Sequence, residues 1–355
     1  MGIGIDSLHL LFKLRQSGYL PTPSAVIEIG AQQLSSTFFD GQFEVDALGE
    51  LFGVKTRFVM PDANPTHIVH GSLKHLEMQA PFARGFYEWL GFRYASIDID
   101  GSPGSVPIDL NYDAVPRWHR GKYQMVTNFG TTEHVANQLN AFRAIHELTA
   151  PNGIMYHQLP SQGMFNHGLV NYNPKFFWML ARSNGYKFIY MDFWGSDEYY
   201  TLPQDVVDVV AEFQPDIVQR RDRYRAADSR VTVVMQKTFD IAYVAPIDVP
   251  TGTRTNLSWL ERRYWTVLRP NVFEHLEEVK ERKKKRKERR ASFLLRARTL
   301  FQSPRLVGTS IAKRVIPRMR NVAKRIIRRM GAENVAKRIT RRMRGKSRAG
   351  SHPGA

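Results

Sequence analysis

Cysteine is missing from all 355 residues of this chain. Its absence excludes disulfide bonds, cysteine nucleophiles and metal sites with cysteine ligands. No uninterrupted apolar run approaches the length that a bilayer-spanning helix needs. The first residues contain no basic stretch ahead of the apolar ones and no clear cleavage site, so we predict no signal peptide. These absences are compatible with a cytoplasmic protein.

Acidic residues are scarce in only one part of the chain. Residues 279–355 hold 27 of the 51 lysines and arginines but 3 of the 33 acidic residues, which gives this segment a net charge of +24. The remaining residues carry a net charge of −6. We therefore predict a mildly acidic globular domain over residues 1–250, a charged helical linker over 251–290, and a basic amphipathic tail with short repeats over 291–355.

Short apolar runs alternate with helical patterns in the first 250 residues. The predicted strands are 25–30, 94–99, 123–128, 154–159, 186–193 and 231–236, and the clearest helices are 135–148 and 174–181. This alternation predicts an α/β fold with a Rossmann-like, doubly wound and mainly parallel sheet. Two segments are too long for simple connections: 34–91, which we predict to be a helical insertion with helices at 73–78 and 82–90, and 196–229, with a helix at 206–213.

Polar residues and glycine follow several of the predicted strands. Gly30 ends the first strand, Asp98 and Asp100 stand at the end of the second, and Asn128 stands at the end of the third. Ligands of open parallel sheets bind outside the carboxyl ends of the strands. A glycine there lets the backbone approach a ligand closely, and a carboxylate can accept hydrogen bonds from ribose hydroxyls. Solvated acids at strand ends are the alternative interpretation of the two aspartates.

Five segments, in sequence order, resemble motifs of class I S-adenosylmethionine-dependent methyltransferases. They read VIEIGAQ, SIDID, PIDLN, YQMVTNFGTTEHV and AFRAIHELTAPNGIMYHQLP, and the resemblance covers roughly residues 20–240. It implies that the chain is a methyltransferase with S-adenosylmethionine as its cofactor. Gln32 departs from the family pattern, because it stands where the family has a second glycine.

The resemblance also implies where the cofactor binds. Glu28, Gly30 and Gln32 would border its methionine part, and Asp98 would bind the ribose. Asp109 would approach the adenine amino group, with Leu110 against the ring. The residues expected near the sulfonium are Asn128, Phe129 and Gly130.

Methyl transfer is an in-line displacement in which the enzyme positions the acceptor and can remove its proton. We expect His157 or His167 to be that base, with Asn171 and Tyr172 as substrate contacts. A structural role is the alternative for each histidine. No His/Asp/Glu group in the sequence shows metal-binding spacing, so we predict no metal.

The reaction we expect is O-methylation of a hydroxylated small molecule, sugar or glycan intermediate, with N-methylation as the alternative. Apolar residues at 311, 315, 319, 322, 326 and 330 form one face of a basic helix in the tail, and the sequence NVAKRI occurs twice there. Such a helix favours an anionic membrane surface, which would place the protein on the inner membrane face. Two further hypotheses are an RNA methyltransferase that uses the tail, because basic residues also neutralise phosphates, and a non-catalytic membrane-surface adaptor.

Overall fold

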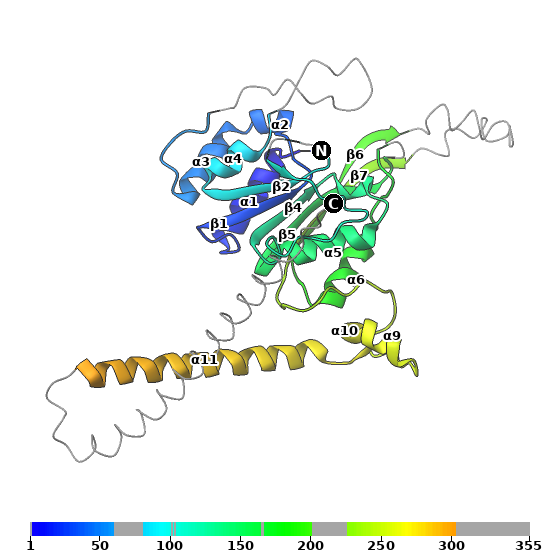
Figure 1. The fold of residues 1–355 in the computed structure, drawn as a ribbon. Coiled ribbons are helices and arrows are strands. Elements are labelled where there is room, and N and C mark those ends of the chain that lie inside the picture. The colour runs from blue at the N-terminus through cyan, green and yellow to red at the C-terminus, as the bar shows by residue number, and fades with distance from the viewer. Residues whose placement is uncertain are drawn as a thin grey trace, which may run out of the picture. The chain divides into compact units, whose positions relative to one another are not determined.

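A computed structural model describes residues 2–59, 81–100, 102, 104–164, 167–200 and 226–302 (Figure 1). The chain divides into two compact units, Met1–Phe273 and Glu274–Ala355. The helices predicted at 73–78 and 206–213 lie outside the described residues, as do the repeats of the tail. Among the helices that are described, none is both long enough and apolar enough to cross a membrane.

A seven-stranded sheet forms the centre of the first unit, with the strand order β3-β2-β1-β4-β5-β7-β6. Its strands are β1 (Ser24–Ile29), β2 (Phe92–Ile97), β3 (Ser105–Val106), β4 (Tyr123–Phe129), β5 (Thr149–Gln162), β6 (Lys187–Tyr200) and β7 (Ala226–Gln236). All neighbouring pairs from β3 to β5 are parallel, and β7 runs antiparallel to both β5 and β6. The mainly parallel Rossmann-like fold predicted from the sequence is confirmed.

Both faces of the sheet are covered. Because successive side chains of a strand point to opposite sides, each central strand contributes residues to both layers. All six residues of β1 are buried. Ile27, Met155 and Val233 face one cluster of apolar residues, which includes side chains of α5 (Gln138–Leu148) and α6 (Pro174–Asn184). The alternate strand residues, among them Val26 and Tyr156, face a second cluster on the opposite side.

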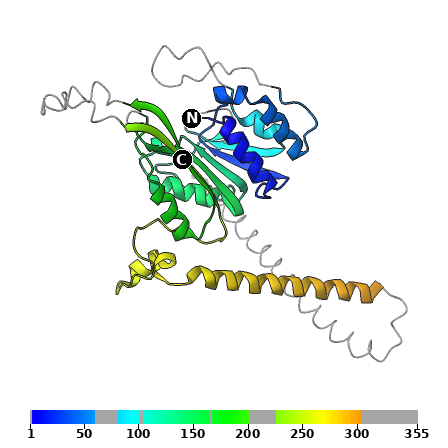
Figure 2. The ribbon, with the colours of Figure 1, turned by 180° about the vertical axis from the view of Figure 1, so that it is seen from behind.

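The second cluster joins the sheet to helices that precede and follow β1. They are α1 (Ile5–Gln16), α2 (Ser36–Phe39), α3 (Gln42–Phe52) and α4 (Arg84–Trp89). Figures 1 and 2 show these helices on the side of the sheet opposite to α5 and α6. The described parts of the predicted helical insertion after the first strand therefore pack on the sheet, and α4 matches the helix expected at 82–90.

Several boundaries differ from the sequence predictions for local reasons. The helix expected at 135–148 begins at Gln138, where Asn137 caps it by accepting a hydrogen bond from the backbone of Asn140 (3.1 Å). A separate 3-10 turn, η2 (Thr132–His134), comes before it. The short strand β3 was not predicted, because two residues are too few to show a pattern.

The helical linker predicted near residues 251–290 is interrupted in the structure. Two short helices, α9 (Ser258–Arg263) and α10 (Trp265–Leu268), precede the long α11 (Val272–Gln302). In the second unit, α11 carries ion pairs one helical turn apart, such as Lys285 with Glu281 at 3.6 Å. Such exposed pairs each stabilise a helix by only a few tenths of a kcal/mol.

Candidate active site

A cavity of about 650 Å³ opens at the carboxyl ends of β1, β2 and β4. It brings together these sequence-predicted residues: Gly30, Gln32, Asp98, Asp109, Leu110, Gly130 and His167. The other sequence-predicted residues do not line it: Glu28, Asn128, Phe129, His157, Asn171 and Tyr172.

The turn after β1 is fixed by glycine conformation and by one glutamine. Gly30 has a φ of +77°, and a Cβ there would collide with the Thr131 hydroxyl. The Gln32 side chain donates to the carbonyl oxygens of Ile29 and Gly30 (both 3.2 Å) and to Thr131 Oγ1 (3.1 Å). Gln32 thus ties the loop after β1 to the loop after β4, a task that a glycine could not perform.

Glu28 lies beneath this turn and is fully buried. Its Oε2 accepts hydrogen bonds from the Gln32 backbone (3.1 Å) and the Tyr94 hydroxyl (2.6 Å). Burial raises the pKa of Glu28 to about 8, although these two hydrogen bonds act in the opposite direction. A carboxyl group that is largely neutral near pH 7 supports the turn through hydrogen bonds rather than through charge.

Asp98 faces the cavity directly after β2. Its Oδ2 accepts a hydrogen bond from the Ala31 backbone at 2.9 Å, and its Oδ1 accepts one from the Asp100 backbone at 3.3 Å. These bonds fix the carboxylate beside the Gly30 turn, and its remaining lone pairs can accept from a ligand. Asp100 also lines the cavity, but its Oδ1 accepts from the Ser102 hydroxyl and backbone (2.6 and 2.8 Å).

The wall beyond Asp98 combines one acid with apolar side chains. Asp109 accepts a hydrogen bond from the Asn111 backbone at 2.7 Å, which fixes its carboxylate at the rim. Leu110, Ile108 and Val135 are buried and line the same cavity. An apolar slot with an acid at its edge fits a flat heterocycle that carries an amino group.

Asn128 and Phe129 support the cavity from below. The Asn128 amide donates to Thr132 Oγ1 at 2.8 Å and lies 3.3 Å from His157 Nδ1. Phe129 packs edge-on against Tyr156 in the core, with ring centroids 4.6 Å apart. Of the three residues expected near a sulfonium, Gly130 alone lines the cavity.

His157 lies in the core and has no exposed surface. Its ring contacts Phe142 and Phe177, with centroid distances of 5.7 and 5.5 Å. Burial lowers the pKa of His157 to about 3, so its ring stays neutral over the physiological range. This position does not support the role of base that the sequence suggested.

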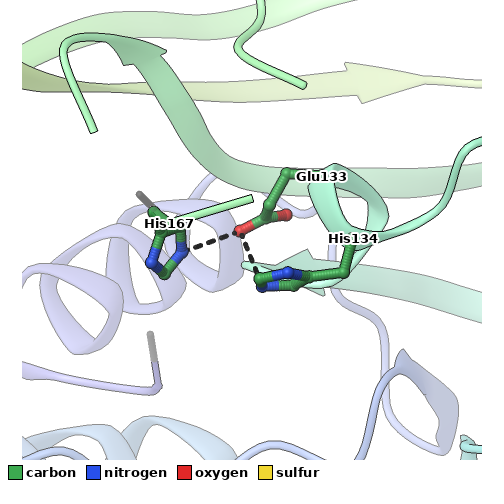
Figure 3. Close-up of side chains that lie close together, drawn as sticks. All are labelled: Glu133, His134 and His167. Carbon is green, nitrogen blue, oxygen red and sulfur yellow. Dashed lines mark hydrogen bonds and ion pairs between the residues drawn. The ribbon is translucent and has the colours of Figure 1, made fainter. Parts of the chain in front are cut away.

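His167 lies at the edge of the cavity and forms a group with Glu133 and His134 (Figure 3). Glu133 Oε1 is 3.3 Å from His167 Nε2 and 4.0 Å from His134 Nε2. The Glu133 side chain is fully buried, whereas each ring is about one-third exposed. Sequence reasoning did not assemble this group, although its Glu133-His134 pair stands within the segment YQMVTNFGTTEHV, which resembles a methyltransferase motif.

Asn171 and Tyr172 hold the segment that carries His167. The Tyr172 hydroxyl is buried and lies 2.8 Å from Thr132 Oγ1 and 2.6 Å from Gln138 Oε1. The Asn171 amide donates to the Gly163 carbonyl at 2.6 Å. The backbone of Leu169 and Val170 donates to the Glu133 carbonyl at 2.8 and 3.2 Å. These residues therefore position His167 instead of facing the cavity themselves.

A second cavity, of about 470 Å³, lies on the α1 side of the sheet. Its lining includes Lys13 of α1, Tyr190 and Asp192 of β6, and Arg230 of β7. These charges have both signs, so the second cavity shows no clear preference for a ligand class.

A family model described as a methyltransferase domain matches residues 10–187. No curated protein matches the chain.

Several solved structures resemble this one at low sequence identity. An S-adenosylmethionine-dependent methyltransferase from Archaeoglobus fulgidus has 11% identity and a TM-score of 0.31, over 64% of this chain and 93% of that one. The 1,6-didemethyltoxoflavin N1-methyltransferase of Burkholderia thailandensis has 10% identity and a TM-score of 0.31, over 65% and 78%. Phosphoethanolamine N-methyltransferase 2 of Haemonchus contortus has 11% identity and a TM-score of 0.33, over 66% and 53%.

Proposed function

The match to the methyltransferase-domain model spans half of this chain, which therefore belongs to that family, and we propose that it transfers the methyl group of S-adenosylmethionine to a hydroxyl group of a small molecule. One observation carries this proposal. A single cavity collects the Gly30 turn, the carboxylates of Asp98 and Asp109, and the ring of His167.

The residues at the Asp98 end of the cavity fit the cofactor. Asp98 can accept hydrogen bonds from the two ribose hydroxyls, because its carboxylate is fixed by the Ala31 and Asp100 backbone. Asp109 can accept from the adenine amino group, with the ring between the apolar side chains of Leu110 and Val135. The Gly30 turn and Gly130 allow close backbone approach to the methionine part. When bound, S-adenosylmethionine supplies an electrophilic methyl group on its sulfonium.

We place the acceptor at the other end, next to His134 and His167, because both line the cavity. Histidine is the side chain that most often handles protons in enzymes. The acceptor hydroxyl would pass its proton to one of these rings or to water at this edge, and its oxygen would take the methyl group, with the electron pair of the broken carbon–sulfur bond left on sulfur. The protein's contribution is to hold oxygen, carbon and sulfur in line.

A hydroxylated acceptor such as a sugar or glycan intermediate is the class we propose. An oxygen acceptor requires loss of a proton, and an edge with two histidines and a carboxylate suits that requirement. An amine acceptor does not need to lose a proton before it attacks the methyl group, since a neutral amine is already nucleophilic. N-methylation is therefore the second outcome of the test below.

The test is transfer of tritium from S-adenosyl-[methyl-³H]methionine to a panel of sugars, glycan intermediates, catechols and amines, with the full chain as enzyme. We expect label in a hydroxylated product, and the variant Asp98→Asn should transfer less. Asp240→Asn is the matched control, because Asp240 is exposed and does not line the cavity. Label only in amines would refute the oxygen acceptor, and no label together with no binding of S-adenosylmethionine would refute the enzyme.

We further propose that the tail attaches the enzyme to an anionic membrane surface. The support comes from its charge and from the apolar stripe between residues 311 and 330 in the sequence. Sedimentation with phosphatidylglycerol vesicles tests this proposal, with phosphatidylcholine vesicles as the control. Binding to the anionic vesicles should depend on residues 303–355. Salt-sensitive binding to RNA without vesicle binding would favour the RNA hypothesis instead.

A further inference from the structure

The group formed by Glu133, His134 and His167 has the composition of a metal site. Two imidazoles and one carboxylate are ligands that first-row divalent metals share, and such sets leave coordination positions open. The three ligand atoms all lie within 4.8 Å of one another. We propose that this group binds one divalent transition-metal ion, such as zinc, manganese or iron(II), beside the proposed cofactor site. This inference departs from the absence of a metal that we predicted from the sequence.

The distances between the ligand atoms support a shared ion. Ligand bonds to zinc are about 2.0–2.2 Å long, so neighbouring ligands of a tetrahedral ion lie about 3.4 Å apart. Glu133 Oε1 is 3.3 Å from His167 Nε2 and 4.0 Å from His134 Nε2. In Figure 3 the two rings approach the same carboxylate oxygen from different sides. Small side-chain rotations would bring all three atoms onto one ion.

The burial of Glu133 is a second and independent observation. Its side chain has no exposed surface, and no described residue makes a hydrogen bond to its Oε2. A buried carboxylate with one oxygen unsatisfied is costly unless a cation compensates it. A metal ion on the Oε1 side, with Oε2 able to join as a second ligand atom, would supply that compensation.

Backbone hydrogen bonds hold His167, the ligand residue that is distant from the other two in sequence. The Glu133 carbonyl accepts hydrogen bonds from Leu169 and Val170, which fixes the segment after His167. Gly168 passes so close that a Cβ there would lie 2.8 Å from Glu133 Cγ. This close approach brings His167, which lies 34 positions away in sequence, against Glu133. A ligand set that is fixed before the ion arrives binds it with a smaller entropy cost.

The position of the proposed metal site beside the cofactor site indicates the class of acceptor. This inference rests on the proposed function. His134 and His167 line the same cavity as Gly30 and Gly130, where the methionine part of the cofactor is proposed. An ion with three protein ligands keeps positions for an acceptor. It lowers the pKa of a bound hydroxyl, whose proton leaves to solvent. We infer that the acceptor presents two neighbouring oxygens, as a catechol or a vicinal sugar diol does, because such a pair chelates the ion and directs one oxygen toward the methyl group.

The test is titration of the full chain, produced without a polyhistidine tag and stripped with a chelator, with Co²⁺ as the probe. Cobalt bound to nitrogen and oxygen ligands shows d–d absorption bands in the visible range. We expect bands that saturate near one equivalent, and at least about a tenfold loss of affinity in His134→Ala and in His167→Ala. Both rings are partly exposed, so these variants should stay folded, which circular dichroism checks.

His9→Ala is the matched control, because His9 also pairs with a glutamate, Glu44, at 3.4 Å. Its cobalt spectrum should equal that of the original protein. If cobalt binds equally to the original protein and to both cavity variants, or does not bind, the metal site is refuted and the pair of Glu133 with His167 is a plain hydrogen bond. Calorimetry with S-adenosylmethionine on the same samples separates the two proposals, since cofactor binding without cobalt binding refutes the metal alone.

Discussion

The two ends of the cavity differ in what forms them. At one end, backbone groups of the Gly30 turn hold the Asp98 carboxylate, and the Gln32 side chain joins two loops. At the other end, three ionisable side chains of Glu133, His134 and His167 meet. The first end provides fixed hydrogen-bond geometry, and the second provides groups that can change charge or bind a cation. Substitutions at the two ends should therefore affect different steps: binding of the cofactor at the first, and methyl transfer at the second.

The largest expected effect comes from removing His167. We expect His167→Ala to lower kcat by about 100-fold to 10,000-fold, the range for a group that assists proton removal. The affinity for S-adenosylmethionine should stay within about threefold, because Asp98 and the Gly30 turn are untouched. Rapid-quench kinetics and calorimetry measure the two quantities. A large loss of cofactor affinity with normal turnover at saturation would show that the two ends are not separate.

Asp98→Asn should produce the opposite pattern. Hydrogen bonds to charged groups contribute about 1.5–3 kcal/mol, so the affinity for S-adenosylhomocysteine should fall by about 10-fold to 100-fold. Asp100→Asn should have a smaller effect, because the Asp100 carboxylate already bonds to Ser102. Calorimetry on both variants makes this comparison. Equal losses in the two variants would mean that Asp98 is not the ribose acceptor.

The pH dependence of folding stability tests the burial of His157. Unfolded His157 takes up a proton below its ordinary pKa of 6.5, whereas the folded ring resists protonation down to about 3. Folding stability should therefore fall as the pH drops below 6.5, by about 2 kcal/mol at pH 5 for this residue. His146, with its pKa lowered to about 4 by burial and by the nearby Lys237 charge, should act in the same direction.

Urea unfolding at pH 7.5 and pH 5 measures this effect. His157→Gln should remove about 2 kcal/mol of the difference between the two pH values, although it destabilises the protein at both. His9→Gln controls for the loss of a histidine. An unchanged pH dependence in His157→Gln would contradict the burial of this ring.

The smallest effect should come from Gly168→Ala. The added Cβ would lie 2.8 Å from Glu133 Cγ, so the segment that carries His167 must shift. We expect turnover to fall by about tenfold and the free energy of unfolding by about 1–2 kcal/mol, typical of overpacking. Gly195→Ala is the control, because the nearest atom to its added Cβ is 3.8 Å away. Full activity in Gly168→Ala would show that this close contact does not position His167.

The first end of the cavity could be predicted because its residues directly follow strands. The strand β1 ends at Ile29, one residue before Gly30, and β2 ends at Ile97, one residue before Asp98. Parallel neighbours place their carboxyl ends together, so adjacency in the sheet brings these two positions to one cavity. Their roles in cofactor binding stay predictions until a ligand is measured.

The second end could not be predicted in the same way. Its residues Glu133 and His167 are 34 positions apart, and the contact depends on a loop path that no local pattern encodes. The position of His157 depended on strand register. In β5, alternate residues face opposite layers, and His157 faces the layer of Met155 and Phe177, where its side chain is fully buried. A shift of one residue would have turned His157 toward the opposite layer, and the apolar sequence of the strand did not indicate which of its residues face which layer.

A crystal structure of the full chain with S-adenosylhomocysteine tests the central claim most directly. We predict ribose hydroxyls on the Asp98 carboxylate, adenine beside Asp109 and Leu110, and the sulfur facing the His167 end of the same cavity. Density for the ligand in the second cavity beside α1, or a ribose that does not touch Asp98, would contradict the account.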